Sequence, residues 1–334
     1  MEAPLSFLMS FFRNADTENP WALHAVFRHL TAQKGKYMDL KVFAEKIQKE
    51  VAGKLGEGYE VRLQEVCKNN GVILQGMLIL TKDCNVSPTI YLNSFWEAYE
   101  GGVTMQNILD KIIQVYEQDT PKTDVDMSFF REFEQVKDGI CYKLISAEQN
   151  RELLETIPHK EYLDLAICFY YAYRGGALGN GSIQVYNSHL ELWNTDVEEL
   201  FLLAQENTPR LFPAEDSAMV DVIREMVSDP DSLTEIVPED IPMRVLGNKE
   251  KTFGAACVLY PGFLEKIAAT RKQGFYLIPS SVHEMILLEN GGHEDVKELR
   301  SMIEEVNLSQ VEPEEVLSNQ LYFYEPSDGL KIIF

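Results

Sequence analysis

Apolar positions near the start of the chain alternate between helical and strand spacing. From Leu40 to Val51 they recur every three or four residues, which predicts an amphipathic helix over 38–55. The next two apolar runs flank Asn69-Asn70-Gly71, and Asn-Gly favours the positive φ angles of a tight turn between two strands. A short strand at 88–92 and two helices complete an α-β-β-β-α-α unit over 38–118, with Thr104 as cap of the second helix.

The remainder of the chain predicts strands in neighbouring pairs and several helices. The segment 128–164 has mainly helical spacing, and a helix beginning at 195 has Thr195 or Asp196 as its cap. Four pairs of strands are expected, at 164–174 with 181–187, 243–248 with 255–260, 274–279 with 284–289, and 320–325 with 330–334. Two further helices are expected over 261–272 and 293–307.

This arrangement predicts an α+β fold, in which antiparallel, hairpin-based sheets pack with helices. Strands that follow one another in hairpins favour antiparallel layers over a doubly wound parallel sheet. We expect two domains, at 38–118 and 128–334, separated by a linker over 119–127. Residues 1–37 are expected to form an amino-terminal extension before a natural start at Met38; the alternative is that a short helix over 21–30 docks on the domain.

The net charge of the chain argues against some classes of binding partner. The 334 residues carry 53 acidic and 30 basic side chains, a net charge of −23, which repels nucleic-acid phosphates and anionic lipids. The segment 195–241 alone holds thirteen acids and two bases. We therefore expect no nucleic-acid and no membrane partner, and an acidic surface exposed to solvent; a surface that mimics DNA is the alternative.

Cysteine usage and hydropathy bear on location and cofactors. The five cysteines are odd in number and scattered, and none has the spacing of zinc ligands. No apolar run approaches the roughly 18 residues that span a bilayer, and the first residues lack the basic region of a signal peptide. These features predict a cytoplasmic protein with buried thiols, no metal and no cofactor.

The stretch 275–289, FYLIPSSVHEMILLE, holds the residues that most resemble a catalytic group. Ser280 or Ser281 could serve as a nucleophile with His283 as its base. The G-x-S-x-G elbow of many hydrolases is absent, however, and Pro-Ser-Ser between two apolar runs is typical of a turn whose hydroxyls bond nearby backbone groups. A strand-joining turn is the favoured interpretation, and a hydrolase is the alternative.

Three other patterns have a structural interpretation beside a functional one. His283-Glu284 and His293-Glu294 lack the second histidine of HExxH, which argues against a metalloprotease. The loop around Gly179, Asn180 and Gly181 has the glycines of a phosphate loop but no lysine, so it is a candidate ligand loop or an ordinary hairpin loop. Aromatic residues crowd 91–99, where helical spacing favours a core and an exposed subset would indicate a protein-binding surface.

Four short motifs in fixed order, KNNGV, PTIYL, GNGS and IPSSVHE, are similar to those of an uncharacterised bacterial domain-of-unknown-function family. The resemblance spans about 38–324, and the family's chains begin near Met38. The segment 198–325 also distantly resembles the carboxy-terminal half of another uncharacterised bacterial cytosolic family. Neither resemblance implies an activity or a site residue.

The function expected from the sequence is that of an interaction or small-ligand-binding protein without catalytic activity, with a protein or a small molecule as its partner. The hydrolase that uses Ser280 or Ser281 with His283 is the alternative from a different class. Ligand, oligomeric state and biological process are not specified by any pattern in the sequence.

Overall fold

The computed structural model describes residues 38–82, 84–121, 124–175, 179–226, 241–271, 274–292 and 295–334. The predicted extension over 1–37 lies outside these residues. The chain divides into two compact units, each considered by itself: a smaller one that includes the described residues up to Ser128 together with Arg174–Gly181, and a larger one of Phe129–Tyr173 and Ser182–Phe334.

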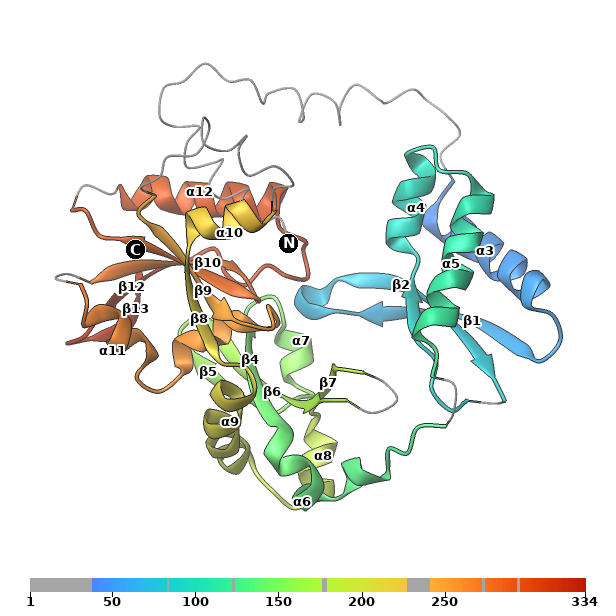
Figure 1. The fold of residues 1–334 in the computed structure, drawn as a ribbon, viewed down its shortest axis with the longest axis horizontal. Helices are drawn as coiled ribbons and strands as arrows, with labels where there is room; N and C mark the ends of the chain where they lie inside the picture. Colours follow the sequence, from blue (N-terminus) through green and yellow to red (C-terminus); the bar gives the residue numbers. More distant parts are fainter. Residues whose placement is uncertain are drawn as a thin grey trace. The chain divides into compact units, whose positions relative to one another are not determined.

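The smaller unit is a three-stranded antiparallel sheet packed with three helices (Figure 1). Its elements follow in the predicted order: α3 (Leu40–Leu55), β1 (Tyr59–Cys67), β2 (Ile73–Thr81), β3 (Thr89–Tyr91), α4 (Asn93–Glu100) and α5 (Met105–Asp119). Phe43 of α3, Met77 of β2 and Ile112 of α5 are fully buried in their common core. Burial of one apolar stripe from each helix against the sheet is what stabilises this unit.

Local signals fix the ends of these elements. Asn70 and Gly71 have positive φ angles, 60° and 68°, at the turn between β1 and β2, as predicted from Asn-Gly. The Thr104 hydroxyl accepts a hydrogen bond from the Asn107 amide and caps α5. The aromatic residues of α4 are half-buried against the core, and the Trp96 indole donates to the Met38 carbonyl at 2.7 Å. They therefore pack as predicted for core residues.

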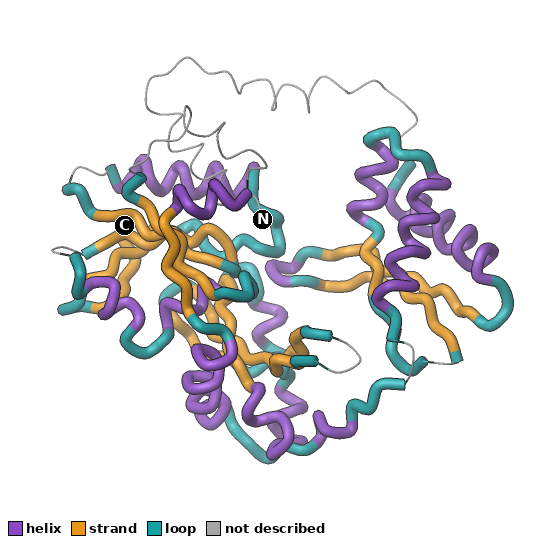
Figure 2. The backbone as a smooth tube through the Cα atoms, viewed as in Figure 1, coloured by secondary structure: helices purple, strands orange, loops and turns teal. Residues whose placement is uncertain are grey.

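The larger unit contains two sheets. The six-stranded sheet has the order β13-β12-β10-β11-β9-β8, and the four-stranded sheet has β4-β6-β5 with β7 also paired to β6. Figure 2 draws the strands in orange. The strands are β4 (Ile140–Ser146), β5 (His159–Tyr162), β6 (Leu165–Tyr173), β7 (Gly181–Gln184), β8 (Ala214–Ala218), β9 (Met243–Asn248), β10 (Phe275–Ser281), β11 (Glu284–Glu289), β12 (Leu321–Glu325) and β13 (Gly329–Ile333).

Helices and short 3-10 turns cover these sheets. They are η2 (Ser128–Arg131), α6 (Phe133–Val136), η3 (Lys137–Gly139), α7 (Arg151–Leu154), α8 (Asn187–Trp193), α9 (Val197–Leu211), α10 (Met219–Met226), η6 (Gly254–Leu259), α11 (Phe263–Ala268) and α12 (Val296–Ser309). Both α10 and α12 lie on one face of the six-stranded sheet (Figure 1), where Ile286 of β11 packs with Ile223 and Ile303.

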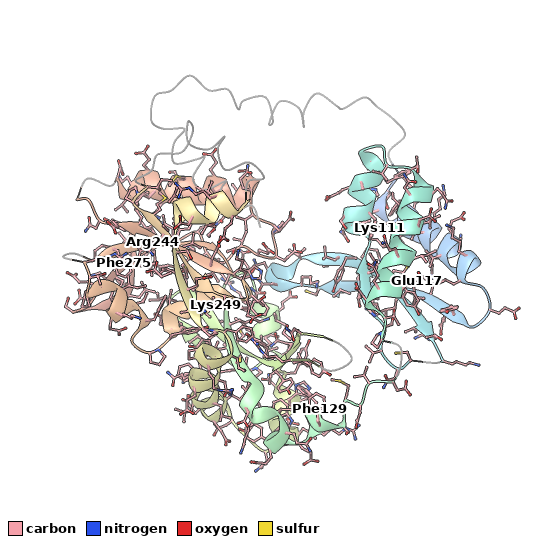
Figure 3. All side chains as sticks on the ribbon, viewed as in Figure 1. Lys111, Glu117, Phe129, Arg244, Lys249 and Phe275 are labelled. Carbon is pink, nitrogen blue, oxygen red and sulfur yellow. The ribbon has the colours of Figure 1, made fainter. Side chains whose placement is uncertain are left out.

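The opposite face of the six-stranded sheet meets the four-stranded sheet and η6 in the main core. Leu277 and Leu287 project from β10 and β11 into this core, together with Tyr142 of β4 and Phe169 of β6. Phe275, labelled in Figure 3, stacks on Tyr324 with ring centroids 5.3 Å apart. The central strands are therefore buried on both faces, which explains their continuous apolar sequences.

The predicted α+β class with antiparallel sheets is confirmed, but two local predictions are wrong. The segment 128–164 is not mainly helical, because Ile140–Ser146 forms β4, which pairs with β6. Residues 255–260 do not form a strand beside 243–248, because β9 pairs with β11 and β8 instead and Gly254–Leu259 is a 3-10 helix. In both cases tertiary pairing decides a short apolar run whose spacing fits helix and strand alike.

Candidate functional site

The candidate catalytic residues lie at the tight turn between β10 and β11. The strands pair with Leu277 opposite Leu287 and Ser281 opposite Glu284, and the register shifts between Pro279 and Ser281. Ser280 and Ser281 are only 2% and 3% exposed. Because buried hydroxyls need hydrogen-bond partners, the turn itself has to satisfy both serines.

Both hydroxyls have partners within the turn. The Ser281 Oγ accepts a hydrogen bond from the His283 backbone amide at 3.0 Å, which is the local turn chemistry predicted from the sequence. The Ser280 Oγ donates to Glu284 Oε1 at 3.3 Å. Among the hydrogen bonds of the described residues, none joins either hydroxyl to the imidazole, so this geometry lacks the contact between nucleophile and base that a serine hydrolase uses.

Both ring nitrogens of His283 also contact other residues. Nδ1 accepts a hydrogen bond from the Phe253 backbone amide at 3.1 Å, and Nε2 lies 3.5 Å from Glu315 Oε1. The Phe253 ring stacks on the imidazole, with centroids 5.8 Å apart and planes 15° apart. A nitrogen that accepts an amide proton must be unprotonated, so the imidazole is neutral with its proton on Nε2, directed at Glu315. Its one lone pair is therefore occupied by Phe253.

The two carboxylates beside the turn differ in their environment. Burial raises the pKa of Glu284 above its ordinary value, opposed by the hydrogen bond from Ser280 and by the nearby His283. The hydrogen bond with His283 lowers the pKa of Glu315, opposed by partial burial. Burial thus opposes the charged form of Glu284, whereas the contact with His283 favours the charged form of Glu315, although both carboxyls interact with the same imidazole.

Segments distant in the sequence hold this turn in place. The Val282 amide donates to the Glu315 carbonyl at 2.9 Å, and the Val282 carbonyl accepts from the Ala255 amide at 3.4 Å. A Cβ on Gly254 would come within 2.4 Å of the His283 carbonyl oxygen, so only glycine fits there. Sequence reasoning missed Phe253, Gly254 and Glu315, because each is about 30 residues from the turn and none lies in a motif.

The glycine loop lies in the hairpin between β6 and β7. Gly179 has a φ of 70°, and the Asn180 side chain accepts a hydrogen bond from the Gly175 amide at 3.1 Å. Gly181 is exposed and begins β7, so a strand follows the loop where a phosphate loop would continue into a helix. The ligand-loop prediction for Gly179, Asn180 and Gly181 stays a prediction.

An open hollow of about 400 Å³ lies where α8 meets α9. It is lined by Leu190, Glu191, Asn194, Thr195, Asp196 and Glu199. Asp196 is the cap of α9 and accepts from the Glu199 amide at 2.9 Å, while the Thr195 hydroxyl donates to the Glu199 carboxylate at 2.6 Å. Half of the lining residues are acidic and none is basic, so the hollow favours cationic groups over anions.

The described residues offer neither a metal site nor a membrane-spanning helix. There, no cluster of three or more histidine, cysteine, aspartate or glutamate side chains has the arrangement of a metal site. Of the helices in these parts of the chain, none combines the length and apolar character needed to cross a bilayer. The second His-Glu pair, His293-Glu294, lies outside the described residues.

Comparison with known proteins identifies a family but no activity. No curated protein and no solved structure matches the chain. A family model described as a family of unknown function, DUF5688, matches residues 40–326, from the first residue of α3 to the turn that joins β12 and β13. The chain therefore belongs to the DUF5688 family, a family of unknown function.

Proposed function

We propose that this protein is a non-catalytic binding protein whose acidic hollow between α8 and α9 receives a basic, amphipathic segment of a partner protein. The observation that carries the proposal is the composition of the hollow, in which Glu191, Asp196 and Glu199 converge without a basic lining residue. The amino-terminal end of a helix attracts anions, but here Asp196 and Glu199 already occupy it. Their remaining negative charge faces solvent and favours a cation.

Exposed apolar side chains at α8, the helix that supplies part of the lining, favour a peptide over a bare cation. Leu192 is 54% exposed and Tyr186 is 43% exposed, both at α8, and Leu190 lines the hollow itself. A partner segment that alternates basic and apolar residues could place its charges on the carboxylates and its apolar side chains on Leu192 and Tyr186. The net charge of −23 would also speed the encounter with such a partner.

The thiols support a cytoplasmic location for this function. All five cysteines lie within the described residues and are thiols, three of them buried. Burial raises the pKa of Cys168 to about 12, so this thiol stays protonated and unreactive. The sequence predicted buried thiols, and this is wrong for Cys67, which is exposed; a reducing compartment suits a protein of this size whose five thiols are all unpaired.

A titration with synthetic peptides tests the proposal. The probe is an amphipathic Arg/Leu peptide, and an Arg/Ser peptide of equal charge is the apolar control. We expect the Arg/Leu peptide to bind more tightly by calorimetry, with amide shifts confined to 186–199. Glu191→Gln should weaken binding by roughly threefold through loss of one charge near the peptide. Glu304→Gln, at an exposed glutamate of α12, should leave the affinity unchanged.

Two results would contradict the proposal. Equal weakening by Glu191→Gln and Glu304→Gln would mean that the peptide responds only to the overall charge. Equal affinity for the two peptides would remove the role of Leu192 and Tyr186. Spermidine serves as the small-molecule arm: if it binds at the hollow and the peptides do not, the ligand is a small cation and not a protein segment.

A further inference from the structure

The loop 248–253, between β9 and η6, has strained backbone at two positions. Lys251 and Phe253 both have a φ of 51°, in the left-handed region that bulky residues rarely adopt. Such conformations persist only when surrounding contacts determine them. The left-handed conformation of Lys251 and Phe253 therefore depends on the contacts that the loop makes with its surroundings.

Two side chains hold the loop from the inside. Asn248, which is 3% exposed, donates to the Thr252 carbonyl at 2.8 Å and accepts from the Thr252 amide at 3.2 Å. His283 accepts from the Phe253 amide and stacks on the Phe253 ring. The first acceptor is an amide oxygen that does not titrate. The second is an imidazole nitrogen, which stops accepting a hydrogen bond once it binds a proton.

We propose that His283 is a pH-sensitive latch, which holds Phe253 in its left-handed conformation while the imidazole is neutral and releases the loop when Nδ1 binds a proton. A protonated Nδ1 is a donor, so it cannot accept the Phe253 amide and the two hydrogens repel. The imidazolium keeps its contact with Glu315, which becomes a full ion pair. Protonation thus breaks the hydrogen bond between the Phe253 amide and Nδ1, and it strengthens the contact between Nε2 and Glu315.

Charged groups around the ring set the balance between the two states. Glu315 lies 3.5 Å from Nε2 and favours the charged ring. Glu284, the first residue of β11, interacts with the imidazole as well, and it favours the charged ring only when its own carboxyl is ionised, which burial opposes. From β4, Lys143 places its ammonium 4.9 Å from the centre of the Phe253 ring, which opposes a second cation there. Lys251 is paired with Glu225 of α10 at 3.5 Å, so its charge is partly compensated.

Release of Phe253 would also change contacts between the loop and neighbouring elements. Its ring packs on Tyr170 of β6 with centroids 5.2 Å apart, on the face of the four-stranded sheet that also holds Cys141 and Phe212. The pair between Lys251 and Glu225 connects the same loop to α10. A change at His283 would therefore reach the four-stranded sheet through the packing of Phe253 on Tyr170.

Nuclear magnetic resonance on the full chain tests the latch. Long-range proton–nitrogen spectra report which imidazole nitrogen carries the proton, and the spectrum of His283→Asn assigns the His283 signals among the six histidines. We expect the Nε2–H tautomer in alkaline solution, at pH 8, and a fall in the protection of the Phe253 amide wherever acid, down to pH 5, protonates the ring. The hydrogen-exchange protection factor of the Phe253 amide should fall by roughly tenfold between these conditions, as expected for loss of one hydrogen bond.

Controls separate the latch from general loosening of the fold. The Tyr142 amide donates to the Thr208 hydroxyl, which does not titrate, so its protection should not change with pH. In His283→Asn the side-chain oxygen can take the place of Nδ1 as a permanent acceptor, and Phe253 should stay protected at both pH values. Glu315→Gln removes the partner that favours the charged ring, so the loss of protection should move to lower pH.

The proposal is overturned by an Nδ1–H tautomer at pH 8, or by equal protection of Phe253 at both pH values in the unmodified protein. It is also overturned if His283→Asn shows the same loss of protection, because another group would then drive it. Should His283→Asn fail to fold, His283→Gln assigns the imidazole signals in its place, and the exchange measurements on the unmodified protein and on Glu315→Gln decide the question.

Discussion

Leu287→Ala tests whether the β10–β11 hairpin is the packed centre of the larger unit. Leu287 is 0% exposed and lies on β11, between Leu277 of β10 and Arg244 of β9. The substitution removes three carbons, worth about 2.4 kcal/mol at roughly 0.8 kcal/mol each. Strands hydrogen-bonded on both sides cannot collapse into the space, so a cavity penalty adds about 1 kcal/mol or more.

We therefore expect a loss of about 3–4 kcal/mol in the free energy of unfolding. For a unit of this size that corresponds to a fall in melting temperature of about 6–16 °C. Urea unfolding followed by circular dichroism measures the free energy, and a slope equal to that of the unmodified protein shows that the same surface unfolds.

Two further variants provide stability losses with which the loss for Leu287→Ala can be compared. Leu202→Ala makes the same change at a position of α9 that is 65% exposed, and it should cost less than about 0.5 kcal/mol. Ser281→Ala removes the acceptor of the His283 amide and should cost about 0.5–1.5 kcal/mol. If Leu287→Ala costs no more than Leu202→Ala, the reasoning that places β11 at the centre of the core is refuted.

Three further predictions follow from single contacts in the larger unit. Tyr322→Phe removes the hydroxyl that donates to Asp164 Oδ1 at 2.7 Å, across the two sheets, and should cost about 1–3 kcal/mol in urea unfolding; an unchanged midpoint would show that the bond contributes nothing. Glu284 has a pKa raised above its ordinary 4.5 in the folded protein, so its contribution to stability is greatest at low pH and is lost as pH rises through that raised value. The melting temperature of Glu284→Gln relative to the unmodified protein should accordingly be more favourable at pH 7 than at pH 4, and the opposite trend would contradict the burial argument. A fluorophosphonate probe should not label either serine of the turn, because the lone pair of His283 is bonded to a backbone amide; labelling that His283→Ala abolishes in a folded protein would favour the hydrolase alternative.

The candidate site shows how far local sequence patterns reach. Two apolar runs joined by PSSVHE predicted the hairpin, and the turn chemistry of Ser281 followed from its position before the His283 amide. The residues that contact the His283 imidazole could not be predicted from the sequence. Phe253 and Glu315 approach His283 from 30 and 32 positions away, and no periodicity relates residues on separate elements.

The sequence by itself determined the elements whose signals are local. Asn-Gly required positive φ angles at the turn between β1 and β2, Thr104 and Asp196 could cap α5 and α9, and amphipathic spacing fixed the buried face of α3. Strands that occur in hairpins also determined the antiparallel α+β class. These features depend on contacts within a few residues, which the order of the amino acids already specifies.

Only the tertiary structure decided the segments whose stability comes from distant partners. Ile140–Ser146 became β4 because β6 offers a strand edge and a core on both faces, while its spacing alone suited a helix equally well. Gly254–Leu259 became a 3-10 helix because β9 already pairs on both edges and Gly254 approaches the His283 carbonyl closely. The hydrogen bond of His283 Nδ1 was decided in the same way, since its donor is a backbone amide from a strained loop and not a residue of its own motif.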